Sequence, residues 1–402
     1  MKLRLLTIIG ARPQIIKAAA FSRAVAAWNK NAQKPEVEEF ILHTGQHYDD
    51  NMSAVFFREL GIPEPDCNLH VGSGSHGVQT ARMLEGIENV LIEAQEKGHG
   101  FDGVVLYGDT NSTLAGAVAA SKLHIPVFHI EAGLRSFNMS MPEEINRIVC
   151  DQLSSILFSP TMTGIRNLEN EGFVVYDADG KKDSDKVKSR RFKNGKLQYA
   201  LLSGDVMYDN AVFFARMAEE KSDILQRLRL KDKDFVLATI HRPANTDNAD
   251  NLTNIMKALA DIAEAGTDVV LPLHPRTRKL LPDKLPSALL RRIEESPRFQ
   301  MIEPASFFEI VCLERHARVV MTDSGGVQKE AFFYGTPCVI LRPETEWVEI
   351  VEAGAGIIAD ADYSRIMQAY NDLSGRMVHF PPLFGDGNAA QNIIASIVDY
   401  LH

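Results

Sequence analysis

Short apolar runs and longer amphipathic stretches alternate along the chain. The runs consist mainly of Val, Ile and Leu, and in the first half they lie at residues 3–9, 38–43, 103–107, 126–130 and 156–158. Near-continuous apolarity over about five to seven residues is typical of strands that are covered on both faces of a parallel sheet. Between them, apolar residues recur at helical spacing over 15–27, 80–94 and 112–123. The pattern predicts a βαβ series.

The same alternation starts again in the second half. Strands are predicted at 235–240, 268–273, 319–322 and 337–341, and helices at 248–265, 326–333 and 363–373. We therefore expect an α/β protein of two Rossmann-like domains with parallel sheets. The amphipathic segment 388–401 is predicted to be a C-terminal helix that crosses back to the first domain. The expected bounds are 1–203 plus 386–402 for the first domain and 204–385 for the second.

The most polar stretch, residues 177–200, separates the two series and contains eight Lys and Arg residues. This composition favours a solvated loop or hairpin, and an anion-binding arm is the alternative.

Composition limits the classes of function. The chain has 402 residues, 24% of them charged, and a net charge of -10, so neither nucleic acid nor an anionic membrane is indicated as a partner. The four cysteines lack CxxC spacing and indicate free thiols in a reducing compartment. No apolar stretch approaches the roughly 20 residues that span a bilayer. The apolar run at the N-terminus is too short for a signal peptide. We expect a cytoplasmic protein.

Two motifs follow predicted strands in the first half. GARPQIIK (10–17) opens a helix, so Arg12 and Lys17 lie where strand ends and helix N-termini attract anions. They could neutralise a diphosphate, and the alternative is that both are solvated surface charges. In YGDT (107–110), Asp109 either points into a ligand site or caps the following helix. Taken alone, the residue types favour the cap.

Two further motifs supply carboxylates. In HIEAGLRS (129–136), Glu131 follows a buried strand and needs solvent or a partner, which Arg135 could provide. In PEEINR (142–147), Glu143 and Arg147 share a helix face, where a salt bridge is the structural alternative. Carboxylates crowded in a partly buried site have raised pKa values and can act as general acids or bases. The candidates are Asp109, Glu131 and Glu143.

The second half carries nucleotide-type motifs. TIHRPAN (239–245) ends a strand with His241 and Arg242. TDSGGVQKE (322–330) places Ser324, Gly325 and Gly326 at a helix N-terminus, an arrangement that cradles phosphate, although a plain strand–helix turn is the alternative. Glu330 could accept hydrogen bonds from ribose hydroxyls.

Six blocks in this order, GARPQIIK, GDTNST, HIEAGLRS, PEEINR, TIHRPAN and TDSGGVQKE, resemble the non-hydrolysing UDP-N-acetylglucosamine 2-epimerase family over nearly the whole length. The resemblance implies a glycosyltransferase-B-like fold, a homodimer, and no metal or nicotinamide cofactor. It also implies anti elimination of UDP across C1–C2 to a 2-acetamidoglucal, followed by re-addition of UDP with protonation of C2 on the opposite face.

The family's functional residues fall on the motifs above. The resemblance implies catalytic roles for Asp109, Glu131, Glu143 and His241. The expected substrate contacts are Arg12, Lys17, Arg135, Arg147, Arg242, Ser324, Gly325, Gly326 and Glu330.

One departure concerns the sugar. Trp347 stands in TEWVE (345–349) where better-known members have arginine, and this form resembles the branch that acts on UDP-2,3-diacetamido-2,3-dideoxy-glucuronate. We expect interconversion of UDP-GlcNAc and UDP-ManNAc, with the same inversion on that uronate, or a hydrolysing 2-epimerase that releases ManNAc and UDP, as alternatives. A glycosyltransferase of the same fold and a binding module without catalysis are more distant alternatives, and three cleft carboxylates fit the latter poorly.

Overall fold

The computed structural model describes residues 2–31, 33–45, 63–176, 198–273 and 275–402. Most of the polar stretch predicted as a loop or hairpin, 177–197, lies outside these residues. The chain forms two compact units: unit 1 is Met1–Asn210 with Leu383–His402, and unit 2 is Ala211–Pro382. Helix α7 (Val206–Lys221) runs through the boundary between them. The expected domain bounds lay a few residues away, at 203/204 and 385/386.

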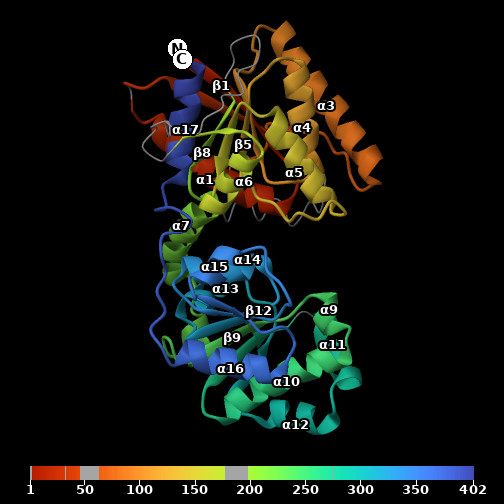
Figure 1. Cartoon of the computed structure of the whole chain (residues 1–402), viewed down its shortest axis with the longest axis vertical. Helices are drawn as coiled ribbons and strands as arrows, with labels where there is room; N and C mark the ends of the chain where they lie inside the picture. Colours follow the sequence, from red (N-terminus) through yellow and green to blue (C-terminus); the bar gives the residue numbers. More distant parts are fainter. Residues whose placement is uncertain (1, 32, 46–62, 177–197, 274) are drawn as a thin grey trace. The chain divides into compact units, whose positions relative to one another are not determined.

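Unit 1 is built on a parallel sheet with strand order β3-β2-β1-β4-β5-β6-β8-β7. Its strands are β1 (Lys2–Ile9), β2 (Glu36–His43), β3 (Cys67–Asn68), β4 (Gly103–Tyr107), β5 (Val127–Ile130), β6 (Ile156–Ser159), β7 (Val174–Tyr176) and β8 (Tyr199–Leu202). Its described helices are α1 (Arg12–Trp28), α3 (His76–Glu96), α4 (Asn111–Lys122), α5 (Pro142–Leu153), α6 (Met162–Asn170) and α17 (Ala389–Leu401). Helix α17 packs beside α1, so the chain ends on the unit in which it begins (Figure 1).

Small residues let α4 lie close to the sheet of unit 1. Ala115, Ala117 and Ala119 are fully buried on this helix. A Cβ on Gly116 would lie 2.7 Å from a methyl carbon of Leu106 and 2.9 Å from one of Ile8. The close approach fixes the N-terminus of α4 against the carboxyl ends of β1 and β4.

Unit 2 repeats the plan with strand order β11-β10-β9-β12-β13-β14, again parallel. Its strands are β9 (Phe235–Thr239), β10 (Asp268–Pro272), β11 (Phe299–Ile302), β12 (Val319–Thr322), β13 (Cys338–Ile340) and β14 (Gly356–Ile358). Its helices after α7 are α8 (Ile224–Arg227), α9 (Pro243–Thr246), α10 (Ala249–Glu264), α11 (Pro275–Lys284), α12 (Ser287–Glu295), α13 (Phe307–His316), α14 (Gly325–Phe333), α15 (Val348–Glu352) and α16 (Tyr363–Ser374).

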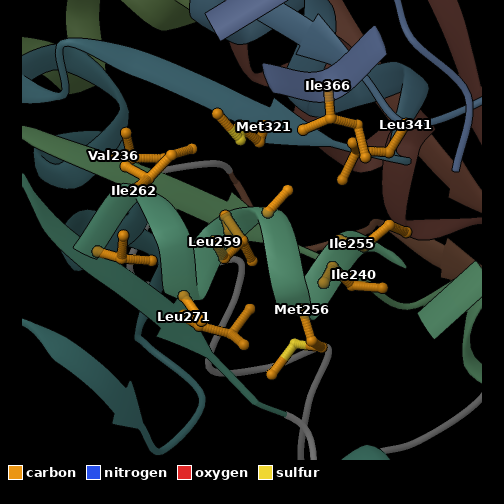
Figure 2. Close-up of a cluster of buried hydrophobic side chains, with 14 of the residues drawn as sticks. Val236, Ile240, Ile255, Met256, Leu259, Ile262, Leu271, Met321, Leu341 and Ile366 are labelled. Carbon is orange, nitrogen blue, oxygen red and sulfur yellow. The ribbon is translucent and has the colours of Figure 1, made fainter. Parts of the chain in front are cut away.

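Helix α10 forms the centre of one hydrophobic layer of unit 2. Its side chains, including Leu259 and Ile262, lie among Val236 of β9, Leu271 of β10 and Met321 of β12 (Figure 2). All five are fully buried. Each such side chain contributes about 1.5–3 kcal/mol by leaving water. The sequence's helical spacing over 248–265 thus produces the packing that holds the strands in register.

Each sheet has a switch point where the strand order reverses near its centre, between β1 and β4 in unit 1 and between β9 and β12 in unit 2. Ligands of open α/β sheets bind at the carboxyl ends of strands at such a switch point. The prediction of two parallel-sheet α/β domains is confirmed. None of the helices in the described part of the chain has the length and apolarity that a membrane crossing requires.

Candidate active site

The turn after β1 is closely packed because Gly10 has no side chain. A Cβ there would lie 2.2 Å from both Ser112 Oγ and Thr44 Oγ1, which are 2.8 Å apart and hydrogen bonded to each other. Glycine at this position therefore lets the ends of β1 and β2 meet the N-terminus of α4.

Gln14, in the first turn of α1, links this turn to the end of β4. Its Oε1 accepts hydrogen bonds from the N–H groups of Gly10 (2.9 Å) and Ala11 (3.1 Å). Its Nε2 donates to Tyr107 O (2.9 Å) and Thr113 Oγ1 (3.0 Å). This role was not predicted, since a glutamine in an amphipathic helix carries no signal of its partners.

Two ion pairs join four of the predicted charged residues of unit 1. Lys17 pairs with Glu131, and Arg147 pairs with Asp109. Lys17, Glu131 and Arg147 side chains are only 12–13% exposed, whereas Asp109 is 29% exposed. The pairs therefore stand at the surface of a partly buried site at the carboxyl ends of β4 and β5.

The Asp109 carboxyl has a raised pKa. Burial is the main cause, and the charges of Glu131 and Glu143 add to it, while Arg147 and Lys17 act in the opposite direction. A carboxyl with a pKa raised in this way is a candidate general acid or base. Thr110 rather than Asp109 caps α4, since its hydroxyl accepts the N–H of Thr113 (3.4 Å). The expectation of an Asp109 cap is therefore wrong, and the Asp109 side chain points elsewhere.

Helix α5 is tied to the Asp109 turn by Asn146. Its Nδ2 donates to the carbonyl of Asp109 (3.0 Å) and to Asn111 Oδ1 (3.1 Å). Glu143 lies in the first turn of the same helix with its side chain exposed, and Glu144 is buried.

Glu131 has a backbone conformation that side chains rarely adopt. Its φ of 71° lies in the left-handed region, and its N–H donates to Phe158 O (3.0 Å). Non-glycine residues held in this way cluster at functional sites.

Arg135 does not pair with Glu131, contrary to the structural alternative for that motif. Its guanidinium contacts Asp151 Oδ2 (2.7 Å) and Glu171 Oε1 (2.7 Å), and its side chain is 1% exposed. This geometry favours a supporting role for Arg135 over the expected substrate contact.

In unit 2, Asp323 orients His241. The buried carboxylate of Asp323 accepts the N–H groups of His241 (3.2 Å) and Arg242 (3.0 Å), the Asn245 amide (3.1 Å), and lies 3.0 Å from His241 Nδ1. Burial acts to raise the pKa of Asp323, but these hydrogen bonds outweigh it and lower the pKa. The His241 side chain is 58% exposed, so its Nε2 is the ring nitrogen that can meet a ligand. Asp323 was not predicted, although it directly precedes the Ser-Gly-Gly turn.

Helix α14 begins at that turn. Ser324 caps it by accepting the N–H of Val327 (3.4 Å), Gly325 is buried and Gly326 is exposed. Trp347 is 8% exposed and its indole Nε1 donates to Gly325 O (2.9 Å). The Trp347 side chain thus packs against the Ser324–Gly326 turn and stabilises it.

The structure therefore brings the predicted residues together as two sets, one on each unit. Both sets lie at the carboxyl ends of the strands, in unit 1 beside β1, β4 and β5 and in unit 2 beside β9 and β12. Unit 1 holds Arg12, Lys17, Asp109, Glu131, Glu143 and Arg147; unit 2 holds His241, Arg242, Ser324, Gly325, Gly326 and Glu330. The Arg12 and Arg242 side chains are exposed and Glu330 is half-buried.

Residues 29–398 match the family model described as UDP-N-acetylglucosamine 2-epimerase. The chain belongs to this family. The family predicted from the six motifs is therefore confirmed. A Pseudomonas aeruginosa protein named UDP-2,3-diacetamido-2,3-dideoxy-D-glucuronate 2-epimerase is 46% identical over 97% of this chain and 98% of its own length.

Solved structures of family members have the same fold. The UDP-GlcNAc 2-epimerase of Methanocaldococcus jannaschii aligns with a TM-score of 0.80 at 35% identity, covering 99% of this chain and all of the other. A second structure from that organism, described as a complex with UDP-GlcNAc and UDP, aligns with a TM-score of 0.73 at 36% identity and the same coverage. The glycosyltransferase-B-like architecture predicted for the family is thus confirmed.

Proposed function

We propose that this protein is a non-hydrolysing 2-epimerase that inverts C2 of a UDP-linked 2-acetamido sugar. The observation that carries the proposal is the Asp109–Glu131 pair of carboxylates, on neighbouring strand ends, each matched with a cation. Inversion needs two acid/base groups, because the proton leaves one face of C2 and returns to the other. Paired and partly buried carboxylates with different surroundings can supply both roles.

The first step breaks the C2–H and C1–O bonds. A carboxylate removes the C2 proton, the electron pair forms the C1=C2 bond of a 2-acetamidoglucal, and UDP leaves with the electrons of the C1–O bond. The second step adds UDP back to C1 while C2 takes a proton on the other face. Asp109, Glu131 and Glu143 are the proposed acid/base groups, and Lys17 and Arg147 balance their charge.

Unit 2 is the proposed site of UDP. The capped N-terminus of α14 at Ser324–Gly326 offers N–H groups to phosphate oxygens, and His241 with Arg242 adds donors on the adjacent strand end. Glu330, in the same helix, is proposed to bind the ribose hydroxyls.

Two sugars are candidates. One is UDP-GlcNAc, which the description of the Methanocaldococcus jannaschii relative names, at 35–36% identity; we propose that it would be interconverted with UDP-ManNAc. The 46% identity to the Pseudomonas aeruginosa enzyme favours UDP-2,3-diacetamido-2,3-dideoxy-glucuronate as the preferred sugar.

The decisive assay incubates each nucleotide in D₂O and follows C2 by proton NMR. Inversion with deuterium at C2 is expected, faster with the diacetamido uronate than with UDP-GlcNAc. No exchange with either nucleotide would contradict the proposal. Free UDP and free sugar accumulating in step with turnover would identify a hydrolysing enzyme instead.

Variants place the chemistry. Asp109→Asn and Glu131→Gln are each expected to lower kcat by about 10²–10⁴-fold, the range of general acid–base catalysis. Glu85→Gln is the matched control, because this carboxylate is exposed on α3. Equal exchange in all three variants would remove the carboxylates from the mechanism.

We also propose a cytoplasmic homodimer. Exposed apolar side chains before and within α5, Phe137 (79%), Met139 (61%) and Ile145 (43%), offer a patch that a second copy would cover. The free cysteines fit a reducing compartment. Sedimentation should give a dimer that Phe137→Ser with Met139→Ser weakens, and a monomeric wild type would contradict this assembly.

A further inference from the structure

A histidine without exposed surface lies beneath the unit 1 site. His129, on β5, is 0% exposed. Its Nδ1 lies 2.7 Å from Asp151 Oδ1, and its Nε2 lies 2.7 Å from the carbonyl oxygen of Gly108. None of the proposed catalytic steps uses this ring.

The partners determine the protonation of both ring nitrogens. A backbone carbonyl can only accept, so Nε2 must carry a proton. The Asp151 carboxylate also accepts from Arg135 Nη2 (2.7 Å) and from the N–H of Gly133 (3.2 Å), which keeps it ionised. Nδ1 must therefore donate as well, and the ring is an imidazolium.

The local charges agree with this assignment. Burial opposes a charge on His129, but the neighbouring Cys150 and Asp151 outweigh it and hold the pKa of the ring well above its ordinary value. Arg135 is the other cation of this cluster, and Glu171 is paired to it. In the described part of unit 1, the cluster thus has two cations and two carboxylates, with Cys150 beside them.

The cluster holds both loops that carry the candidate carboxylates. Gly108, whose carbonyl accepts the hydrogen bond from His129 Nε2, has φ 64° and directly precedes Asp109. A Cβ on Gly108 would lie 3.0 Å from Glu131 Oε2 and 3.2 Å from Lys17 Nζ. The Lys17–Glu131 ion pair therefore lies directly beside this glycine. On the far side, Asp151 holds the N–H of Gly133, two residues after Glu131.

Stability alone does not explain such a buried charge. Replacing a buried ion pair by apolar residues of similar volume is often neutral or stabilising. One His129 contact goes to loop backbone, the carbonyl of Gly108, and the other goes to Asp151, which in turn accepts the N–H of Gly133. A charged donor fixes a carbonyl more rigidly than a neutral one, since such hydrogen bonds are about twice as strong.

We propose that His129 is a positioning residue: a constantly protonated imidazolium that fixes the Gly108–Asp109 peptide and thereby the spacing of Asp109 and Glu131. The positioning role rests on the proposed function, but the charge of the ring does not. If His129 has this role, C2 proton transfer depends on it and nucleotide binding does not.

The charge is tested by NMR of the full-length protein labelled with ¹⁵N at histidine. Two protected ring N–H signals with imidazolium shifts are expected for His129 from pH 6 to pH 9, and they should be missing in His129→Gln. His43 is the internal control, because it is also buried and its Nδ1 accepts the N–H of Gly45 (2.9 Å). Burial lowers the pKa of His43 to about 4, so its ring should stay neutral. One unprotonated nitrogen on His129 would overturn the assignment.

The positioning role is tested by kinetics. His129→Leu should lower kcat about 10²-fold with KM and UDP affinity changed less than threefold, because the carboxylates shift while unit 2 is untouched. His129→Gln keeps a donor for the Gly108 carbonyl and should recover about tenfold of that loss. A kcat within threefold of wild type in folded His129→Leu, or equal loss in both variants, would overturn the proposal.

Two failures remain distinguishable. If His129→Leu does not fold, the Gln variant and the ring signals still decide. If the wild-type protein shows no C2 exchange, the proposed function fails, whereas two ring N–H signals would leave the charged state of His129 intact.

Discussion

At the scale of single residues, both candidate sites depend on carboxylates whose surroundings set their charge. Asp323 is surrounded by donors and has a lowered pKa, whereas burial, helped by the charges of Glu131 and Glu143, raises the pKa of Asp109. One residue type thus serves opposite purposes. Asp323 is a fixed acceptor that holds His241, and Asp109 is ready to exchange a proton.

Replacing Asp323 should leave His241 without its orienting hydrogen bonds and lower the stability of unit 2. Asp323→Asn removes charge-assisted hydrogen bonds worth about 1.5–3 kcal/mol each, so kcat/KM is expected to fall about 10–100-fold. The stability from a carboxylate with a lowered folded pKa is present above its unfolded pKa of about 3.9 and is lost as the pH falls through the folded value. Urea unfolding should therefore separate wild type and variant at pH 7, and less so near pH 3.5. A constant difference at both pH values would contradict this.

Removing Arg147 should shift the pH dependence of the reaction. Arg147 is the strongest influence that lowers the Asp109 pKa, so Arg147→Met is expected to raise that pKa further. The limb of the kcat/KM profile that reports Asp109 should move to higher pH. Arg166→Met serves as a control, because Arg166 lies on α6 with its side chain exposed. A shift to lower pH in Arg147→Met would contradict the assignment.

At the scale of elements, the loop after β5 is packed against the N-terminus of α6. Gly133 has φ 80°, and its carbonyl accepts the Asn167 amide (3.0 Å). A Cβ on Gly133 would lie 2.5 Å from Gly164 O and 2.8 Å from a methyl carbon of Leu168. Helix α6 therefore holds the loop that carries Glu131.

Replacing Gly133 by alanine should lower the stability of unit 1 by more than the strain of a left-handed backbone conformation alone. Gly133→Ala is expected to destabilise unit 1 by about 3 kcal/mol or more, the sum of αL strain and overpacking. Gly98→Ala is the matched control, since Gly98 has φ 72° and a Cβ there would meet no atom of the described residues within 4 Å, so about 1 kcal/mol is expected. Urea denaturation of both variants measures the difference. Equal losses would show that the packing on α6 is unimportant.

The sequence predicts the elements well because apolar spacing is a local property. The βαβ order and the strand-end motifs follow from runs such as 103–107 and from the turn residues after them. The partners of Gln14, Arg135 and Trp347 are set by residues far away in the chain, and no local pattern encodes them. Trp347 shows this most clearly, since its identity suggested a change in the sugar, while its side chain lies under the Ser324–Gly326 turn.

At the scale of the whole molecule, the C-terminal segment is part of unit 1. Asp205 N–H donates to Phe384 O (2.9 Å), and the Asp209 carboxylate accepts the N–H groups of Ala389 (3.0 Å) and Ala390 (2.7 Å). Asp209, on α7, thus caps α17 from another part of the chain. The apolar pattern of 388–401 predicted the helix and its return, but not this cap.

Loss of the cap should loosen unit 1 only. Asp209→Ala is expected to lower the unfolding free energy of unit 1 by about 1–2 kcal/mol, the usual value of an N-cap. Hydrogen exchange should accelerate along α17 and stay unchanged in α10. Asp223→Ala is the control, because its side chain is 73% exposed. Unchanged exchange in α17 would contradict the assigned role of Asp209.

The same contacts have a consequence for building chimaeras. The chain leaves unit 1 and re-enters it at one place, where a Cβ on Gly204 would lie 3.0 Å from Phe384 O. Unit 2 is therefore one uninterrupted insertion, Ala211–Pro382, in a protein whose other unit is made of two segments. Unit 2 of a relative can therefore be introduced as one continuous segment, with one junction at each end. Cutting the gene after Pro382, by contrast, takes a helix out of the half that carries the carboxylates.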